Sequence, residues 1–266
     1  AAAAAIRPIS LAGEQREGDH IVSAEERDLA ALQASLRDAL PAGPLAAMCA
    51  TADQARALLA FVDVLADKSL RSTVALTAAR GRGKSAALGL ALGGAVALGY
   101  ANVFVTSPSP DNLRTLFQFV VKAFDALGYS EHMHYEVVQS TNPEFKDAVV
   151  RINVFKDHRQ TIQYIRPQDA DKLSQAELVV IDEAAAIPLP LVRSLLGPHL
   201  VFLASTINGY EGTGRSLSLK LIQQLRDQAG SGPGARSLKE VQLAQPIRYG
   251  AADPIEGWLH DLLCLD

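Results

Sequence analysis

A glycine-rich segment followed by a lysine and a hydroxyl residue is the part of this chain best suited to phosphate chemistry. An apolar run precedes it, a helix rich in small residues follows it, and the segment itself reads Thr77-Ala78-Ala79-Arg80-Gly81-Arg82-Gly83-Lys84-Ser85. A strand, a turn and a helix in this order direct backbone N–H groups at a triphosphate. In such a turn Lys84 reaches the β- and γ-phosphate oxygens, and the Ser85 hydroxyl is placed for Mg²⁺.

The first position of this segment departs from the general pattern of glycine, four residues, Gly-Lys and Ser or Thr. Ala78 stands where glycine is usual, but Gly81 and Gly83 still let the backbone approach a phosphate closely. The alternative is a glycine- and lysine-containing loop without special function. The strand and helix on either side favour the phosphate loop.

Two carboxylates follow a second apolar strand. The run Glu177-Leu178-Val179-Val180-Ile181 is short and continuous, as in a buried parallel strand, and it ends in Asp182-Glu183. Open α/β sheets place their chemistry at the carboxyl ends of such strands. We expect Asp182 to hold Mg²⁺, mostly through waters, and Glu183 to polarise the attacking water. An acidic helix start is the alternative, but in combination with Lys84 the pair indicates hydrolysis of ATP or GTP.

Four further segments each allow two interpretations. The residues Thr106-Ser107-Pro108-Ser109 either hold a sugar-phosphate backbone or cap the next helix. Ser205-Thr206 either sense the γ-phosphate or cap a turn. The glycine-dense segment 209–215 either bends sharply or lets a nucleic-acid backbone approach. Arg248 either delivers a guanidinium to the γ-phosphate or forms a surface ion pair.

The composition excludes several classes of protein. The chain has 266 residues, enough for one large domain or two small ones, and its net charge of -4 gives no global basic field for nucleic acid. A local basic groove remains compatible with that charge. Cys49 and Cys264 are too few and too far apart for a disulfide framework or a zinc site, and we expect small buried residues in a reducing compartment. We expect no membrane partner, because no run reaches the length of a span and no secretory signal is visible.

Alternating strands and helices predict the fold that positions these residues. We expect strands at 73–77, 102–106, 149–155, 161–165, 177–181 and 200–205, with helices at 85–97, 113–127 and 189–196 between them. This order favours an α/β fold of the RecA-like P-loop NTPase type, as in helicases, with a mainly parallel central sheet flanked by helices. The strand that ends in Ser205 should lie beside the strand that ends in Asp182.

The N-terminal part is predicted to be helical. A capping box at Ser23 and Glu26 opens a helix that stops before Pro41, residues 41–44 form a linker, and Thr51 begins the next helix. We therefore divide the chain into a helical and linker segment, 1–44, from the end of a preceding domain, and an ATPase module, 45–266.

The two ends of the sequence and one glycine-rich stretch carry further expectations. The chain begins with five alanines without an initiator Met and stops within an apolar pattern, so we expect a piece cut from a longer protein. Residues 227–237 are rich in Gly, Ser and Pro and are interpreted as a flexible surface loop.

Several long segments resemble the RNA cytidine acetyltransferases. They are the phosphate-loop segment, the stretch Val180-Ile181-Asp182-Glu183-Ala184-Ala185-Ala186-Ile187-Pro188, and the stretch from Ser205 to Arg215. Ala78 is itself part of this family's pattern, and the resemblance covers roughly residues 50–266. The stretch from Phe104 to Leu113 resembles the eukaryotic, nucleolar branch more than the bacterial enzyme that acts on the elongator methionine tRNA.

The resemblance implies a helicase-like ATPase module joined to an acetyltransferase domain, which would follow Asp266. Family members use acetyl-CoA and ATP to form N4-acetylcytidine in 18S ribosomal RNA and in some tRNAs, and they take part in maturation of the small ribosomal subunit. The implied partners are pre-18S rRNA, tRNA, proteins of the small-subunit pre-ribosome and a guide RNA. A homodimer is compatible with the resemblance, and the implied location is the nucleus, in the nucleolus.

The resemblance also assigns roles to individual residues. Gln54 matches the glutamine that reads the adenine, Arg248 matches an arginine that contacts ATP, and Asp182 with Glu183 matches the hydrolysis pair. The predicted nucleotide-binding set is therefore Gln54, residues 77–85 and Arg248. The predicted catalytic set is Lys84, Asp182 and Glu183, and Ser85 and Asp182 are the predicted Mg²⁺ ligands.

Two other functions are compatible with these motifs. A stand-alone RNA helicase or translocase would use the same nucleotide residues, but translocation normally requires a second RecA-type lobe, and only about 60 residues follow Ser205. A mainly structural role within a ribosomal precursor would make the nucleotide residues dispensable.

Overall fold

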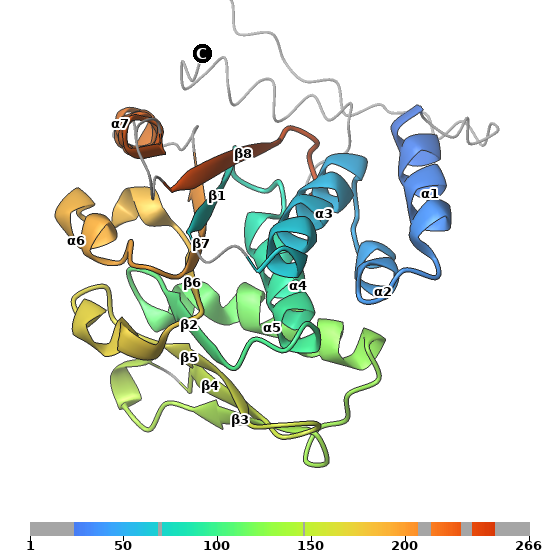
Figure 1. Cartoon of the computed structure of the whole chain (residues 1–266), viewed down its shortest axis with the longest axis horizontal. Coiled ribbons are helices and arrows are strands. Elements are labelled where there is room, and N and C mark those ends of the chain that lie inside the picture. The colour runs from blue at the N-terminus through green and yellow to red at the C-terminus, as the bar shows by residue number, and fades with distance from the viewer. Residues whose placement is uncertain (1–23, 69–70, 146, 207–213, 230–235, 248–266) are drawn as a thin grey trace, which may run out of the picture.

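An eight-stranded sheet between two layers of helices forms the body of the chain (Figure 1). The computed structural model describes residues 24–68, 71–145, 147–206, 214–229 and 236–247. The strand order across the sheet is β3-β4-β5-β2-β6-β7-β1-β8. The strands are β1 (Ser72–Ala78), β2 (Asn102–Thr106), β3 (Tyr135–Gln139), β4 (Val149–Val154), β5 (Gln160–Tyr164), β6 (Leu178–Ile181), β7 (Leu200–Thr206) and β8 (Ser237–Leu243).

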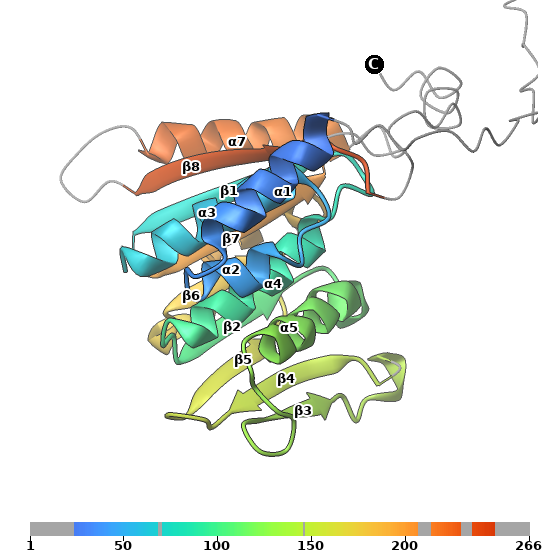
Figure 2. The same cartoon turned by 90° about the vertical axis from the view of Figure 1, so that its right-hand side faces the viewer.

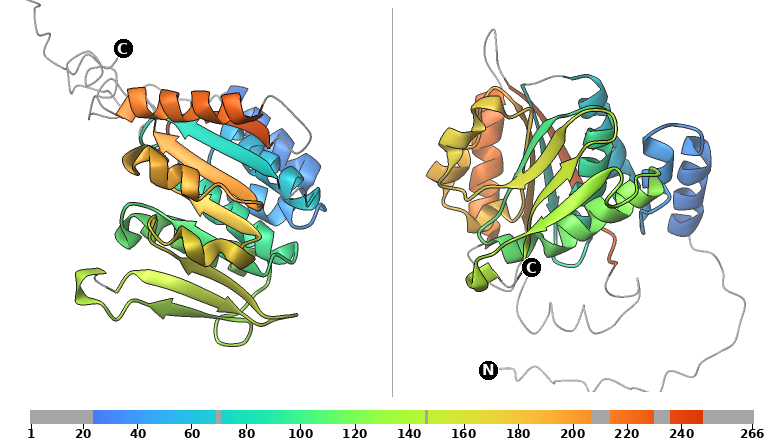
Figure 3. Two further views of the ribbon diagram at one scale, coloured as in Figure 1. Left: turned by 60° about the vertical axis from the view of Figure 1, so that its left-hand side comes forward. Right: turned by 90° about the horizontal axis from the view of Figure 1, so that it is seen from below.

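The helices cover both faces of this sheet (Figures 1 and 3). One face carries α3 (Ala52–Ala66), α4 (Lys84–Ala97) and α5 (Arg114–Ala126), and outside α3 lie α1 (Ala24–Leu36) and α2 (Ala42–Ala46). The other face carries α6 (Leu189–Ser194) and α7 (Gly214–Ala229). Short 3₁₀ helices complete the connections: η1 (Pro110–Leu113), η2 (Pro143–Phe145), η3 (Ala170–Gln175) and η4 (Ala184–Ala186).

The sheet is parallel through its centre and antiparallel at one edge (Figure 2). Strands β5, β2, β6, β7, β1 and β8 pair in parallel, whereas β3 and β4 run antiparallel to their neighbours. The predicted α/β fold with a mainly parallel sheet is therefore confirmed. Strand β7 lies between β6 and β1, with Ile181 opposite Leu203 and Thr77 opposite Ser205. The predicted adjacency of the Ser205 and Asp182 strands is also confirmed.

Two hydrophobic clusters, one on each face, hold the helices to the sheet. The larger cluster joins α2, α3, α4 and α5 to alternate residues of the strands, and the smaller joins α6 and α7 to the opposite residues. The small residues of α4 allow a close approach of α5, because a Cβ at Gly89 would collide with the Leu116 carbonyl and one at Gly93 with Ala123. Core side chains are packed tightly enough for such single atoms to matter.

The end of the sheet remote from the phosphate loop is closed by Arg236. Its guanidinium donates to the Thr73 hydroxyl and the Gly197 carbonyl, both at 2.5 Å, and also to the carbonyl of His199. His199 is 2% exposed, and its Nε2 lies 2.9 Å from the Leu195 carbonyl. Burial lowers the pKa of His199, since the charged ring would lose hydration, and the nearby Arg236 adds to that shift.

Two predicted loops contain more regular structure than expected. Residues 42–44 lie in α2 and Pro41 is its N-cap, and Ala42, Gly43 and Leu45 are buried against the neighbouring helices, so the interpretation of 41–44 as a linker is wrong. The glycine-rich loop at 227–237 is shorter than predicted, because α7 extends to Ala229 and β8 begins at Ser237. Strands β3 and β8 are additions to the predicted set. The division of the chain at residue 44 stays a prediction.

Within the described residues, no helix combines the length and the apolar character that crossing a bilayer requires. Ser23, the first residue of the predicted capping box, lies outside the described residues, but helix α1 begins next to it as predicted.

Candidate functional site

The phosphate-loop segment forms the predicted strand, turn and helix. Strand β1 ends at Ala78, helix α4 begins at Lys84, and both Gly81 and Gly83 between them have a φ near +80°. Glycine adopts this conformation without the steric cost that other residues incur. The first turn of α4 faces the loop, and the backbone N–H groups of a helix N-terminus stabilise a bound anion.

Lys84 lies over the loop that it follows. Its Nζ is 3.2 Å from the Ala79 carbonyl and 3.5 Å from the Ala78 carbonyl, and the residue is 9% exposed. Burial lowers the pKa of Lys84, and the carboxylates of Asp182 and Glu183 oppose that shift. The ammonium group is therefore poorly hydrated, and a phosphate anion bound beside the loop would interact with it more strongly than in water.

A hydrogen bond joins the phosphate loop to the strand that carries the acids. The Ser85 hydroxyl donates to Oδ2 of Asp182 at 2.7 Å, although the two residues are 97 positions apart. Asp182 is 1% exposed, and burial raises its pKa, while hydrogen bonds from Ser85 and from the Glu183 N–H oppose the shift. A cation at this position would relieve the cost of the buried charge.

This pair of side chains fits a magnesium ion. A hydroxyl oxygen and a buried carboxylate are the hard oxygen ligands that Mg²⁺ prefers, usually with several waters retained. The burial of Asp182, which is 1% exposed, supports the fit, because its carboxylate has little access to water and a bound cation would offset its charge.

Glu183 follows in a left-handed backbone conformation, with φ +53°. Such strain in a residue other than glycine is typical of functional sites. Its N–H donates to Oδ1 of Asp182 at 2.9 Å, and its exposed carboxylate accepts a hydrogen bond from Nδ2 of Asn112 at 2.5 Å. Sequence reasoning did not single out Asn112. The sequence alone offered no signal for it, because the contact depends on the pairing of β2 with β6, which brings the turn after β2 beside Asp182-Glu183.

Gln54 lies at the phosphate loop, as the resemblance required. It is 2% exposed near the start of α3, where Thr51 is the N-cap residue and accepts from the Gln54 N–H. Its Nε2 donates to the Gly83 carbonyl at 3.2 Å, and its Oε1 accepts from the Ala50 N–H at 2.8 Å. The structure thus brings Gln54 to the loop, and its reading of an adenine stays a prediction.

The remaining loop residues line the same turn. Arg80 is exposed, Arg82 is 8% exposed, and Thr77 donates from its hydroxyl to the Val241 carbonyl at 3.4 Å. Ser205 is buried and Thr206 is half-buried at the end of β7, between the phosphate loop and the acids. This position fits both interpretations of that pair.

The turn after β2 is tied mainly to itself. Thr106 and Ser107 are fully buried, and the Ser107 hydroxyl donates to the Ser109 carbonyl at 2.6 Å. The Thr106 carbonyl accepts from the Asp182 N–H at 2.9 Å, which fixes this turn beside the acids. The Ser107 contact favours a structural role for that hydroxyl, whereas Oγ1 of Thr106 is buried without a hydrogen-bond partner among the described residues.

Two predicted elements lie outside the described residues. Arg248 is one, and most of the glycine-dense segment, at 209–213, is the other. Their proposed contacts with the γ-phosphate and with nucleic acid therefore stay predictions.

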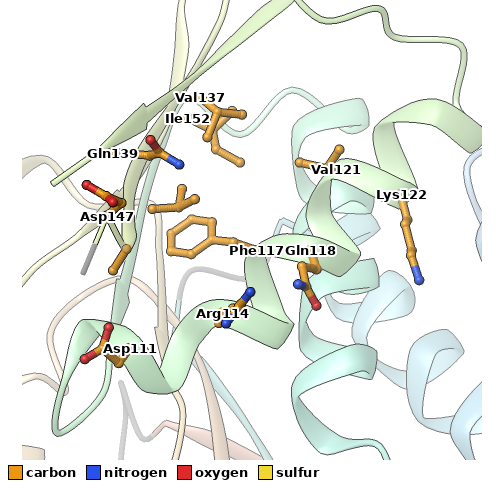
Figure 4. A pocket seen from close by; sticks show the side chains of 12 residues that line it. Asp111, Arg114, Phe117, Gln118, Val121, Lys122, Val137, Gln139, Asp147 and Ile152 are labelled. Carbon is orange, nitrogen blue, oxygen red and sulfur yellow. The ribbon is translucent and has the colours of Figure 1, made fainter. Parts of the chain in front are cut away.

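A separate cavity of about 970 Å³ opens on the other side of η1, between α5 and strands β3 and β4 (Figure 4). Its apolar wall includes Phe117, Val121 and Ile152, and its polar rim includes Asp111 and Arg114. None of the predicted nucleotide residues is among those that line it. The cavity is therefore distinct from the nucleotide site.

Comparison with known proteins places the chain in a family. Residues 75–266 match the model of the helicase domain of the RNA cytidine acetyltransferases NAT10/TcmA. The RNA cytidine acetyltransferase of Mus musculus is 64% identical over 93% of this chain, and that of Saccharomyces cerevisiae is 57% identical over 91%. The matched region covers 26% and 25% of these two relatives, so the chain spans about a quarter of their length.

Among solved structures, the large terminase from a thermophilic bacteriophage resembles the chain with a TM-score of 0.48 and 10% identity, over 88% of this chain and 50% of that one. The match to the family model and the identity to these acetyltransferases are far stronger, and they agree with the phosphate loop and the paired acids described above. The chain belongs to the RNA cytidine acetyltransferase family and contains its helicase-like domain.

Proposed function

We propose that this domain binds ATP with Mg²⁺, hydrolyses it, and thereby serves RNA cytidine acetylation by the protein that carries it. The observation that carries the proposal is the convergence of Lys84 and Ser85, after β1, with Asp182 and Glu183, after β6, at one edge of the sheet. Residues from two distant segments meet there in the arrangement that phosphoryl transfer to water requires.

Each residue has a distinct task in this proposal. Lys84 and the N-terminal N–H groups of α4 bind the phosphate oxygens and offset their charge. Ser85 and Asp182 would hold the magnesium ion, which supplies positive charge to the phosphates when it is bound. Glu183 accepts a hydrogen bond from the attacking water and orients it towards the γ-phosphate. Gln54, buried beside Gly83, would contact the base.

The finer parts of the proposal derive from the family. The matching relatives are named RNA cytidine acetyltransferases, which supports RNA as the substrate. We propose acetyl-CoA as the acetyl donor, N4-acetylcytidine in 18S rRNA and tRNA as the product, and a role in small-subunit maturation in the nucleolus. Pre-ribosome proteins, a guide RNA and a second copy of the protein are the proposed partners. ATP hydrolysis would drive a rearrangement that places RNA for modification.

Lys84→Ala in the protein that carries this chain tests the proposal. Removing one charged contact to the transferring phosphate should lower ATP turnover about 10²- to 10³-fold, and acetylcytidine formation should fall with it. Steady-state ATPase assays and quantification of acetylcytidine in substrate RNA measure the two effects.

The matched control is Lys122→Ala. Lys122 is on α5 at the rim of the separate cavity, where its ammonium lies 4.7 Å from the Phe119 ring, and its loss should leave ATP turnover unchanged. Normal ATP hydrolysis by the Lys84 variant would refute the proposed function. Loss of hydrolysis with normal acetylation would refute only the coupling between them.

A further inference from the structure

A hydrogen bond joins the carboxylate that would polarise water to a turn outside the phosphate loop. Nδ2 of Asn112 donates to Oε2 of Glu183 at 2.5 Å. The two residues come from η1, which follows β2, and from the turn after β6, and these strands are neighbours with Thr106 opposite Ile181. The contact therefore crosses between two loops at the edge of the sheet that binds the nucleotide.

The turn that carries Asn112 is firmly anchored. Pro110 and Leu113 at its two ends are buried, whereas Asp111 and Asn112 between them are exposed. The Asn112 N–H donates to the Ser109 carbonyl at 3.1 Å, which fixes the backbone of the residue. The backbone of Asn112 is thus held in place, and its amide group is presented towards Glu183 from this turn.

The contact also competes with the proposed task of Glu183. A hydrogen bond from an amide to a carboxylate is charge-assisted and stronger than one between neutral groups. A water that Glu183 orients must bind the same carboxylate and would compete with Asn112 for it. The backbone of Glu183 is already fixed by its N–H bond to Asp182, so the side chain is the part that can change partner.

We propose that Asn112 is a positioning residue that restrains Glu183, and that hydrolysis requires this hydrogen bond to open. The inference deepens the proposed ATPase function and rests on it. Asn112 acts through Glu183 and has no contact with the phosphates in this scheme. It makes the basal rate of hydrolysis depend on a turn that also borders the separate cavity, through Asp111 and Arg114.

Asn112→Ala tests this role. Because both side chains are exposed to water, which weakens the net contribution of their charge-assisted bond, we expect kcat for ATP hydrolysis to rise only about two- to ten-fold, the range of one ordinary hydrogen bond. KM for ATP and the affinity for a fluorescent ATP analogue should stay unchanged, since Asn112 does not bind nucleotide. In a Glu183→Gln background the same substitution should change nothing, because the two residues act as one unit.

The matched control is Asn153→Ala. It removes an amide–carboxylate bond of the same kind, from Nδ2 of Asn153 to Oε1 of Glu136 at 2.6 Å, between β4 and β3. Its effect on ATP turnover should be nil. A second measurement needs no turnover: in a crystal structure with a non-hydrolysable ATP analogue, Asn112 and Glu183 should lie beyond hydrogen-bond distance.

An unchanged or lower kcat in the Asn112 variant, or persistence of the contact with the analogue bound, would overturn the inference. Failure of the proposed function would give a different result, because the Lys84→Ala variant would then hydrolyse ATP at the wild-type rate. In that case both proposals fall together.

Discussion

The central parallel strands and the antiparallel edge of the sheet differ in how completely they are buried. Strand β6 is buried throughout and β7 in all but its last residue, whereas β3 is buried only at Tyr135 and β4 only at Ile152 and Val154. Parallel strands covered by helices on both faces need apolar residues at every position, and an edge strand needs them on one face. The difference separates two roles within one sheet.

The two regions also differ in chemistry. Lys84, Ser85, Asp182 and Glu183 all follow the central strands, at their carboxyl ends, where the loops of a parallel sheet converge. Within the antiparallel edge only β4 is reversed, and neither β3 nor β4 contributes a residue to this cluster. This edge forms one wall of the separate cavity instead (Figure 4).

The largest difference should appear when one apolar side chain is shortened in each region. Leu203→Ala in β7 removes a fully buried side chain and should lower the free energy of unfolding by about 2–5 kcal/mol. Val138→Ala in β3, where the side chain is 36% exposed, should cost within about 0.5 kcal/mol. Chemical denaturation of both variants measures the comparison, and equal losses would contradict the division of the sheet.

A smaller difference is expected between two glycines with positive φ. Gly83 has φ +81°, and a Cβ there would come within 2.6 Å of Cδ1 of Ile247 and 2.7 Å of Nε2 of Gln54, whereas Gly128, with φ +72°, has nothing within 4 Å. Gly128→Ala should cost about 1 kcal/mol of unfolding free energy for its backbone conformation alone. Gly83→Ala should cost roughly 2–3 kcal/mol, since it adds a steric conflict.

The same pair of variants separates strain from function. Nucleotide affinity, measured with a fluorescent ATP analogue, should fall for Gly83→Ala and stay unchanged for Gly128→Ala. Equal losses of stability in the two variants would show that the contact with Gln54 does not constrain the phosphate loop.

The smallest effect should be a pH dependence that originates at His199. Because burial lowers the pKa of His199 below its ordinary value of 6.5, the unfolded chain binds a proton more readily than the folded protein does. The contribution of the neutral ring is complete above that value and is lost as the pH falls below it. The unfolding free energy should therefore decrease as the pH falls from about 7.5 to 5.5, and His199→Gln should make this decrease smaller. A slope in the His199→Gln variant equal to that of the wild-type protein would show that the pH dependence originates elsewhere.

The central strands could be predicted from the sequence because their signal is local. Leu178 to Ile181 is a continuous apolar run, and the pattern that contains Lys84 and Ser85 fixes the turn between β1 and α4. The same reasoning predicted that Asp182 lies near Ser85, and the structure joins the two side chains by a hydrogen bond of 2.7 Å. Gln54 was placed at the loop by family resemblance, and the structure puts it there.

The edges of the sheet could not be predicted in the same way. Strand β8 has charged and exposed residues such as Lys239 and Glu240, and its place is set by pairing with β1, more than 150 residues earlier in the chain. The contact between Asn112 and Glu183 has a similar origin, because it depends on the pairing of β2 with β6. Helix α2 is too short for periodicity to reveal it, and its stability comes from packing against its neighbours.

The two hydrogen bonds of Gln54 have a consequence for how the domain would discriminate among nucleobases. Both ends of this amide have partners within the protein, one in the Ala50 N–H and the other in the Gly83 carbonyl. In the proposed function, a base that pairs with Gln54 must replace these bonds with its own and gains little net affinity, whereas a mismatched base would leave its own polar edge without partners. Selectivity at this position would therefore arise from rejection of the wrong base.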